Sequence, residues 1–356
     1  MQRAPSTTPL LSAILCTYSG ADRLRRTFES LRRQTLRRDS FEVVLIDDGS
    51  SDGTRELARA FESELPLRCS RQRHAGLASA RNHGIFLARG DILLFLDDDD
   101  VAHPGLLAAH CDAHCRFPEL HYGVVGSTEL DPAIASDPLM HFVTKSGGFR
   151  FPYPEPHDGE ILDFRYLSGG RSSCKRAFLV QHGVVNPVFR FGRGDIELAY
   201  RLSKRGFKIM YDSRAKSTMA PPIGYDDFCA RLYREGQESF LFSRLHRGAA
   251  IQQWTGVAGA VALWSKLGPR YDAIVRSGRE RDRIVRLRLA KGLPVGEPDI
   301  ELLHRDYSAA FRGSRVKGIV EGMAETGEDL VQGPARQVAG RAEKHDERRA
   351  LLRRWL

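Results

Sequence analysis

With 356 residues the chain exceeds a usual single domain, and its hydrophobic content of 42% is enough to bury a real core. A formal net charge of +9 favours contact with phosphates, nucleotides or an anionic membrane surface, although ordinary solubility explains such a charge equally well. The six cysteines form no CxxC pair, which indicates reduced thiols in a cytosolic protein. Residues 1–9 lack the layout of a signal peptide and no segment reaches the ~18 apolar residues of a membrane span, so we expect a cytoplasmic protein, soluble or peripheral.

Apolar runs and amphipathic segments alternate through the first hundred residues. Each apolar run is short enough for a strand buried on both faces, and a polar turn follows it. The expected strands are residues 10–17, 41–46, 67–72 and 92–96, and helices are expected to begin near residues 22, 52, 76 and 104. This alternation predicts a doubly wound α/β sheet that is mostly parallel.

Four consecutive aspartates, residues 97–100, follow the apolar run 92–96 directly. In an open α/β sheet they would lie at the carboxyl end of a core strand, where such sheets bind ligands. Adjacent carboxylates repel one another, so water or a cation must neutralise them. The placement favours a divalent-metal site over a solvated acidic loop.

The pattern changes after residue 127. Residues 128–165 are rich in Pro and Gly without a sustained period, which predicts an irregular binding loop or lid. Its aromatic side chains suit stacking against a sugar, with loose surface packing as the alternative. They are Phe149, Phe151 and Tyr153.

The last third of the chain is expected to be helical. Residues 196–205 form an amphipathic helix with Asp195 at its start, and 207–211 are the last strand. From residue 226 on, the spacing is helical, and 276–288 are strongly basic with interspersed Ile and Leu. The charged end after residue 333 is expected to be either disordered or helical. Such a basic helix either rests on an anionic membrane or is plainly solvated.

Five segments, in order along the chain, resemble the family 2 glycosyltransferases, which have the GT-A fold and use nucleotide-sugar donors. They are residues 13–18, 43–54, 76–82, 90–99 and 194–202. The resemblance implies a Rossmann-like GT-A domain over residues 1–225, in which 10–127 bind the nucleotide and 128–225 carry the acceptor and catalytic half. Residues 226–356 would be a basic helical extension.

The resemblance also implies roles for single residues. Those expected at the donor are Thr17, Tyr18, Asp48, Arg81, Asp97 and Asp98. Asp97 and Asp99 resemble the DxD pair that ligates Mg²⁺ or Mn²⁺, which would offset charge on the leaving diphosphate. Asp195 resembles the catalytic base that takes the proton of the attacking hydroxyl, with a helix N-cap as the alternative role.

Two positions depart from the family pattern. Many relatives carry Glu-Asp where this chain has Gly194-Asp195, and Glu197 is the residue expected to replace the missing acid in part. Many also carry a metal-ligating His after the last core strand, where we expect residues 217–219 to stand. The second departure puts tight metal binding in doubt.

The expected function is therefore inverting transfer from a nucleotide-diphosphate sugar, with UDP as the first expectation, to a glycan, lipid-linked or protein hydroxyl, as in polysaccharide biosynthesis. The alternative is a non-catalytic sugar-nucleotide-binding or scaffold protein, which the missing His suggests. Nucleic-acid binding ranks last, because no nucleic-acid motif accompanies the basic charge. A zinc site in one helix is a further alternative, weakened by the absence of a second ligand pair. Its residues would be His110, Cys111, His114 and Cys115.

Overall fold

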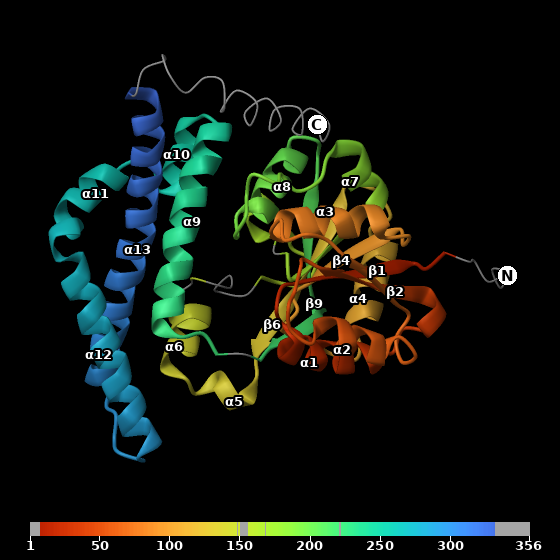
Figure 1. Cartoon of the computed structure of the whole chain (residues 1–356), viewed down its shortest axis with the longest axis horizontal. Coiled ribbons are helices and arrows are strands. Elements are labelled where there is room, and N and C mark those ends of the chain that lie inside the picture. The colour runs from red at the N-terminus through yellow and green to blue at the C-terminus, as the bar shows by residue number, and fades with distance from the viewer. Residues whose placement is uncertain (1–7, 148, 150–155, 168, 221, 332–356) are drawn as a thin grey trace. The chain divides into compact units, whose positions relative to one another are not determined.

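The computed structural model describes residues 8–147, 149, 156–167, 169–220 and 222–331. The chain divides into two compact units, Met1–Pro222 and Ile223–Leu356 (Figure 1). The sequence places the end of the first domain at residue 225, three residues past this division. The functions assigned to each part of the chain stay predictions.

The first unit is built on one nine-stranded sheet. Its strands are β1 (Leu11–Thr17), β2 (Phe41–Asp47), β3 (Leu67–Arg71), β4 (Ile92–Leu96), β5 (Asp100–Ala102), β6 (Tyr122–Leu130), β7 (Ile161–Leu162), β8 (Arg171–Lys175) and β9 (Lys208–Met219). They follow the order β3-β2-β1-β4-β8-β6-β9-β5, and β7 pairs with β9. The first four of these are parallel, as are β6 and β9, whereas β8 is antiparallel to both of its neighbours. The mixed, mostly parallel sheet confirms the predicted α/β class.

Helices cover both faces of this sheet (Figure 1). They are α1 (Ala21–Arg32), α2 (Thr54–Phe61), α3 (Leu77–Leu87), α4 (Leu106–Arg116), α5 (Pro132–Ala135), α6 (Pro138–His141), α7 (Arg176–His182) and α8 (Gly194–Ser203), with short turns η1 (Arg38–Ser40), η2 (Phe142–Ser146) and η3 (Phe164–Tyr166). The apolar residues of α1, α2 and α4 form one core with one face of the strands, and those of α3, α7 and α8 form another with the opposite face. Successive strand residues point to opposite faces, so β1 sends Ile14 to one core and Leu15 to the other.

Small residues bring α3 unusually close to the sheet. A Cβ at Gly84 would lie 2.5 Å from Ile14 Cγ2, which is closer than real Cβ atoms approach. Ile14 and Ile85 are both buried there. Burying each such side chain contributes about 2 kcal/mol. The small residues therefore fix where α3 presents its polar side chains at the end of the sheet.

The segment 128–165, predicted to be irregular, is partly regular. β6 continues to Leu130, and α5 and α6 follow it directly. Asp131 and Asp137 each cap a helix whose first residue is proline, a combination that satisfies free N–H groups and presets the first turn. Phe149 packs against Phe142 with ring centroids 5.8 Å apart, while Phe151 and Tyr153 lie outside the described residues.

The last strand is longer than predicted. β9 runs to Met219 instead of ending near residue 211, because it shifts register against β6 between Gly126 and Ser127 and then continues. A Cβ at Gly126 would overlap with the Ala215 carbonyl oxygen, so the shift depends on a glycine.

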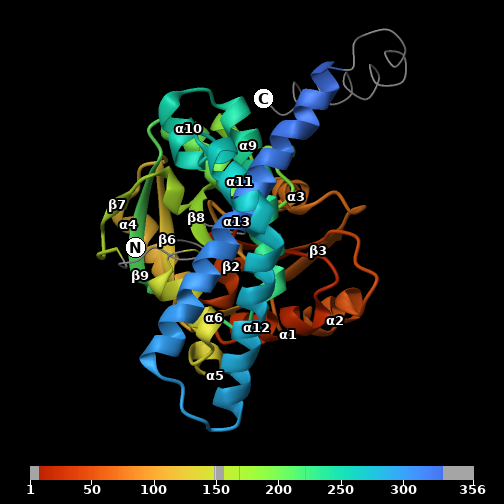
Figure 2. The ribbon, with the colours of Figure 1, turned by 90° about the vertical axis from the view of Figure 1, so that its left-hand side faces the viewer.

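The second unit is entirely helical in its described part. It contains α9 (Tyr225–Leu245), α10 (Ala249–Thr255), α11 (Ala260–Leu267), the turn η4 (Gly268–Arg270), α12 (Tyr271–Ala290) and α13 (Glu297–Val331), which confirms the predicted helical extension. α9 and α13 run side by side (Figures 1 and 2), and a Cβ at Gly236 or Gly318 would overlap with a carbonyl oxygen of the opposite helix. Tyr307 and Phe311 are fully buried and stack with centroids 5.5 Å apart.

Within residues 8–331, apart from the short gaps, no helix combines the length and the apolar character needed to cross a bilayer.

Candidate active site

Three turns meet at the carboxyl ends of the neighbouring strands β1, β2 and β4. Asp48 N donates to Thr17 O at 2.9 Å, which joins the turn after β2 to the turn after β1. Ser19 N donates to Ser50 Oγ at 2.9 Å, and Ser50 N donates to Asp47 Oδ1 at 2.7 Å. These bonds satisfy polar groups that a turn would otherwise leave unpaired.

Asp98 joins the turn after β4 to the start of α1. Thr17 Oγ1 donates to Asp98 Oδ2 at 2.5 Å, and Thr27 Oγ1 donates to the Asp98 carbonyl at 3.0 Å. Burial raises the pKa of the Asp98 carboxyl, although Thr17 and Arg23 act in the opposite direction. The structure thus places Asp98 between β1 and α1, where it holds Thr17.

Asp48 is 4% exposed, and its carboxylate is surrounded by donors. Oδ1 accepts from Gln72 Nε2 at 2.7 Å and from Ala75 N at 2.9 Å. Oδ2 accepts from Gly76 N at 2.9 Å and lies 2.9 Å from His74 Nδ1. The carboxylate therefore fixes the turn 74–76 that leads into α3.

His74 brings a ring to this turn that sequence reasoning missed. Tyr18 is 52% exposed and stacks on His74, with ring centroids 4.1 Å apart and an interplanar angle of 27°. Asp48 contacts the same imidazole, so the pair forms a fixed aromatic surface at the sheet edge.

Arg81 on α3 bridges two of the predicted functional acids. Its side chain is 9% exposed, forms an ion pair with Asp195, and lies 3.3 Å from Asp97 Oδ1. Burial lowers the pKa of the guanidinium, but Asp195 and Asp97 raise it, and the net shift is upward. Arg81, which the resemblance places at the donor, therefore lies between Asp97 and Asp195.

Gly169 and Gly170 pack against this arginine and its acids. Gly169 N donates to Asp195 Oδ2 at 2.9 Å, so both oxygens of that carboxylate have partners. A Cβ at Gly169 would overlap with the Arg81 guanidinium, and one at Gly170 would overlap with the Asp97 carboxylate. Two adjacent glycines often mark a close approach of the backbone to other groups, so this pair is the feature of the sequence that could have indicated the contact.

Asp195 lies in the first turn of α8, as expected, and Asn82 supports the loop before that helix. Asn82 Nδ2 donates to Val185 O at 2.7 Å, and Val185 N donates to Asn82 Oδ1 at 2.9 Å. A Cβ at Gly194 would lie 3.0 Å from Val185 Cγ1. The position where relatives carry Glu is therefore tightly packed here, and Asn82 is a supporting residue that sequence reasoning did not single out.

The acidic run is unevenly exposed. The Asp97 side chain is 47% exposed, whereas Asp100 is buried. Burial raises the pKa of Asp100 well above its usual value, and the charges of Asp97 and Asp99 raise it further. The carboxylate oxygens of Asp97 and Asp99 are of the type that Mg²⁺ and Mn²⁺ prefer.

Cys16, the residue before Thr17, links the two sides of the site. Burial raises the pKa of its thiol to about 12. The charges that also act on it are, in decreasing order, those of Arg81, Asp97, Asp48 and Asp98. The structure therefore brings the predicted donor residues, the acidic run and, through Arg81, Asp195 together at one edge of the sheet.

The structure shows where the two departures from the family pattern lie. Glu197 is fully buried and pairs with Arg201 at 2.9 Å, so it does not face an incoming acceptor as a substitute acid would. Residues 217–219 belong to β9, and Ser217 pairs with Ala102 of β5. They are therefore strand residues and do not occupy the position after the last strand.

In the helix considered for zinc binding, the two histidines contact a serine hydroxyl. His110 Nδ1 lies 2.8 Å and His114 Nε2 2.9 Å from the Ser173 hydroxyl. Cys111 is buried, whereas Cys115 is exposed. Across the described residues no group of three or more His, Cys, Asp or Glu side chains forms a metal cluster.

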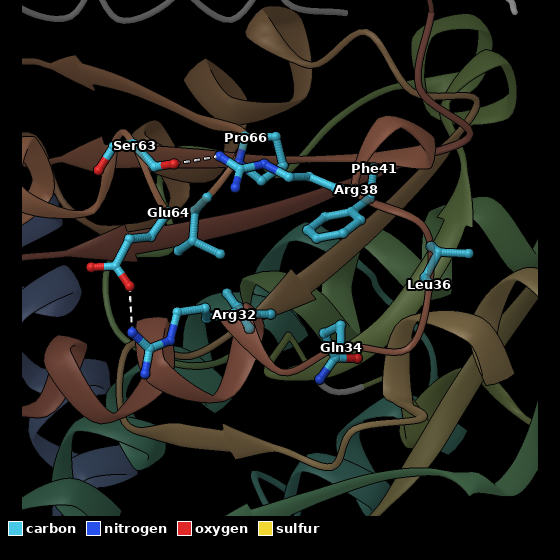
Figure 3. Close-up of a pocket in the computed structure, with 10 residues that line it drawn as sticks. Arg32, Gln34, Leu36, Arg38, Phe41, Ser63, Glu64 and Pro66 are labelled. Atoms are coloured by element: carbon cyan, nitrogen blue, oxygen red, sulfur yellow. Dashed lines mark hydrogen bonds and ion pairs between the residues drawn. The ribbon is translucent and has the colours of Figure 1, made fainter.

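A hollow of about 430 Å³ lies at the opposite edge of the sheet, where β2 begins with Phe41 (Figure 3). Arg32 forms an ion pair with Glu64 there, and Arg38 donates to the Ser63 carbonyl at 2.8 Å. It contains none of the predicted site residues.

Comparisons with known proteins agree with this geometry. Residues 12–134 match the family model described as Glycosyl transferase family 2. Validoxylamine A glucosyltransferase of Streptomyces hygroscopicus subsp. jinggangensis is 44% identical over a segment covering 31% of this chain and 28% of that protein. The uncharacterized glycosyltransferase YfnE of Bacillus subtilis is 38% identical over 56% of this chain and 62% of its own length. The matches thus span less than two thirds of these relatives.

A mannosyltransferase of Pyrobaculum calidifontis has the same fold, with a TM-score of 0.58 and 18% identity over 90% of this chain and 89% of that one. The first unit is accordingly a GT-A glycosyltransferase fold. Residues 12–134 of the chain thus resemble glycosyltransferase family 2.

Proposed function

We propose that the chain is an inverting glycosyltransferase that moves a sugar from a nucleotide-diphosphate donor to an acceptor hydroxyl. The observation that carries the proposal is the bridge made by Arg81, which contacts both Asp97 and Asp195. The acid assigned to the donor diphosphate and the acid assigned to the acceptor thus lie on either side of one guanidinium. A reacting sugar must be placed between two such groups.

The nucleotide would bind where β1 and β2 end. Tyr18 and His74 offer a flat surface to a base, with UDP as the first expectation for the donor, and Asp48 holds that surface in place. Asp97 and Asp99 would hold Mg²⁺ or Mn²⁺ together with the diphosphate, and the cation would offset charge on the leaving group. The mannosyltransferase with the same fold was solved with GDP-Man and Mn²⁺.

Asp195 would act as the general base. A sugar hydroxyl is a poor nucleophile, so a carboxylate must accept its proton during attack on the anomeric carbon. Attack from the side opposite the diphosphate inverts the anomeric centre. Arg81 occupies one Asp195 oxygen in this state, and a bound diphosphate offers the guanidinium a competing anion. Donor binding would then free Asp195 for the acceptor.

Glycans, lipid-linked molecules and proteins are the acceptor classes covered by this proposal. Peripheral membrane association stays a prediction. The basic side chains of α12 give it limited support, because acids of the same helical unit neutralise many of them. These pairs are Arg279–Asp226, Arg281–Asp306, Arg286–Asp282 and Arg288–Asp299.

A donor screen tests the proposal directly. Purified protein is incubated with UDP- and GDP-sugars, with and without Mn²⁺ or Mg²⁺, and release of the nucleoside diphosphate is measured. Metal-dependent release that is abolished in Asp99→Ala, and reduced about 10³-fold in Asp195→Asn, supports it. Donor binding without turnover, unchanged by Asp195→Asn, would instead identify a non-catalytic sugar-nucleotide-binding protein.

A further inference from the structure

A second hollow, of about 440 Å³, lies where β6 and β9 begin. The residues that line it do not belong to the acidic run. Its wall includes His121, His182, Arg205 and Lys208, and Phe178 and Leu120 contribute apolar surface. Gly123, near the start of β6, and Leu93, near the start of β4, both pair with Cys174 of β8. The hollow therefore lies at the end of the sheet where β4 begins, whereas Asp97 follows the end of β4. It is therefore separate from the candidate active site.

The charged side chains that line this hollow are all positive. None of the residues that line it is acidic. Arg205 and Lys208 are exposed, and neither forms an ion pair with a carboxylate of the described residues. Lys208 Nζ lies 5.7 Å from the centre of the Tyr122 ring instead. This differs from Arg32 at the first hollow and Arg279 on α12, each of which pairs with an acid.

The two histidines are held in place by aromatic rings. The His182 ring lies 4.5 Å from the Phe178 ring, and the His121 ring lies 4.5 Å from the Tyr122 ring. These contacts fix the imidazoles without using their nitrogen atoms. The N–H group of each imidazole therefore stays available as an additional hydrogen-bond donor.

Helix ends do not account for this charge. His182 is the last residue of α7, and Arg205 follows the end of α8, so carbonyl dipoles there attract cations. Each helix C-terminus is equivalent to only about −0.5 charge, whereas Arg205 and Lys208 carry two full positive charges. Lys208 begins a strand and His121 precedes one, so neither stands at a helix end.

We propose that this hollow binds the phosphate group of a phosphate ester, with the organic part of the ligand against Phe178 and Leu120. Two permanent cations match the charge of about −1.5 to −2 on a phosphate monoester better than the single charge of a carboxylate. The guanidinium of Arg205 forms paired hydrogen bonds to phosphate oxygens, and the Lys208 ammonium adds a point charge. Leu120 is 47% exposed and supplies apolar surface at the rim. The proposal does not depend on glycosyltransferase activity.

The test uses the full-length protein and phenyl phosphate as the probe. Binding is followed by isothermal titration calorimetry at low salt, in the wild type and in the double variant Arg205→Gln/Lys208→Gln. We expect a loss of affinity of about tenfold or more in the variant, because two charge-assisted contacts are removed. Leu120→Ser should remove the preference for phenyl phosphate over inorganic phosphate while both still bind.

The matched control is Arg25→Gln/Arg55→Gln, which removes the same charge from exposed positions on α1 and α2. Unchanged affinity in this control, together with the loss in the hollow variant, supports the site. Equal loss in both variants would show a non-specific response to net charge and overturn the proposal. Unchanged affinity in Arg205→Gln/Lys208→Gln would place the binding elsewhere on the protein and overturn the proposal as well.

Discussion

Arg81 on α3 and Asp195 on α8 form an ion pair across 114 positions of the chain. The same guanidinium reaches Asp97 at 3.3 Å, and Gly169 N holds the second oxygen of Asp195 at 2.9 Å. Sequence reasoning assigns these two acids to different steps of sugar transfer. The arginine between them is therefore the residue whose removal should affect both steps.

Replacing Arg81 should damage stability and turnover together. Arg81→Ala removes a buried guanidinium from the largely buried Asp195 and from the half-exposed Asp97, so we expect the free energy of unfolding to fall by about 2–3 kcal/mol. Turnover of the donor should fall by about 10²-fold or more, since positioning errors of this size are costly. Arg81→Lys keeps the charge but cannot bridge two carboxylates as a fork, so it should restore stability better than turnover.

Arg37→Ala is a suitable control for Arg81→Ala. It also removes an arginine from an ion pair, with Asp39, but both side chains are largely exposed. Urea denaturation should detect no change in this control. Wild-type turnover in Arg81→Ala would remove the arginine from the proposed mechanism.

Gly169 gives a second test of the same contact. In Gly169→Ala the new methyl group would overlap with the Arg81 guanidinium, which is enclosed by its two acids and cannot move freely. We expect donor turnover to fall at least about tenfold. Gly105→Ala is the matched control, because no atom lies within 4 Å of its new Cβ. Equal steady-state rates for the two variants would contradict the close packing at Gly169.

Local pattern was enough for much of the fold. Apolar runs such as residues 10–17 and 92–96 correspond to β1 and β4, because burial on both faces leaves an uninterrupted hydrophobic signal. The pattern failed where a strand or helix depended on distant residues or on capping. The full length of β9 depends on a glycine of β6, and α5 and α6 are marked only by an Asp-Pro pair each.

The site shows the same division. Acids at strand ends were visible because the carboxyl edge of a parallel sheet collects them. The sequence did not show whether an acid faces the ligand or the protein. The carboxylates of Asp48 and Asp98, for example, accept hydrogen bonds from neighbouring segments of the protein. His74, Gly169 and Asn82 were missed because their partners come from other elements, and such pairs leave no periodic signal. Their functional roles stay predictions.

Asn82 should affect the chemical step more than donor binding. Asn82→Ala leaves the N–H and the carbonyl of Val185 without partners, which should lower the free energy of unfolding by about 1–3 kcal/mol. Because Val185 packs beside Gly194, the change reaches Asp195, so we expect kcat to fall while the KM for donor changes little. Steady-state kinetics with varied donor separates the two parameters.

The half-buried neighbour Asn186 provides the control for Asn82. Its side chain accepts a hydrogen bond from Val188 N at 3.1 Å in the same loop. Asn186→Ala should leave kcat within about twofold of the wild type, because no contact to the start of α8 passes through it. A parallel loss of kcat in both variants would indicate general loosening of the loop and not positioning of Asp195.

A buried chain of hydrogen bonds connects β8 with α4. Lys175 Nζ lies 3.2 Å from His114 Nδ1, and an ammonium only donates, so the proton of neutral His114 must be on Nε2. His114 then donates to Ser173 Oγ, and the Ser173 hydroxyl donates to His110 Nδ1. The proton of His110 is left on Nε2, which is buried without a hydrogen-bond partner among the described residues. The chain therefore accommodates two neutral imidazoles.

These histidines predict a loss of stability in acid. Burial lowers the pKa of His110 to about 4, and burial together with Lys175 lowers that of His114 to about 3. An unfolded histidine binds a proton near pH 6.5, so below that pH unfolding takes up protons and the free energy of unfolding decreases as pH falls toward 4. Each histidine contributes a slope of up to ~1.4 kcal/mol per pH unit.

Urea denaturation at pH 7.5, 6 and 5 should show a shallower slope of stability against pH in His110→Gln, whereas the exposed control His157→Gln keeps the slope of the wild type. Identical slopes in all three proteins would mean that His110 is not held neutral by burial.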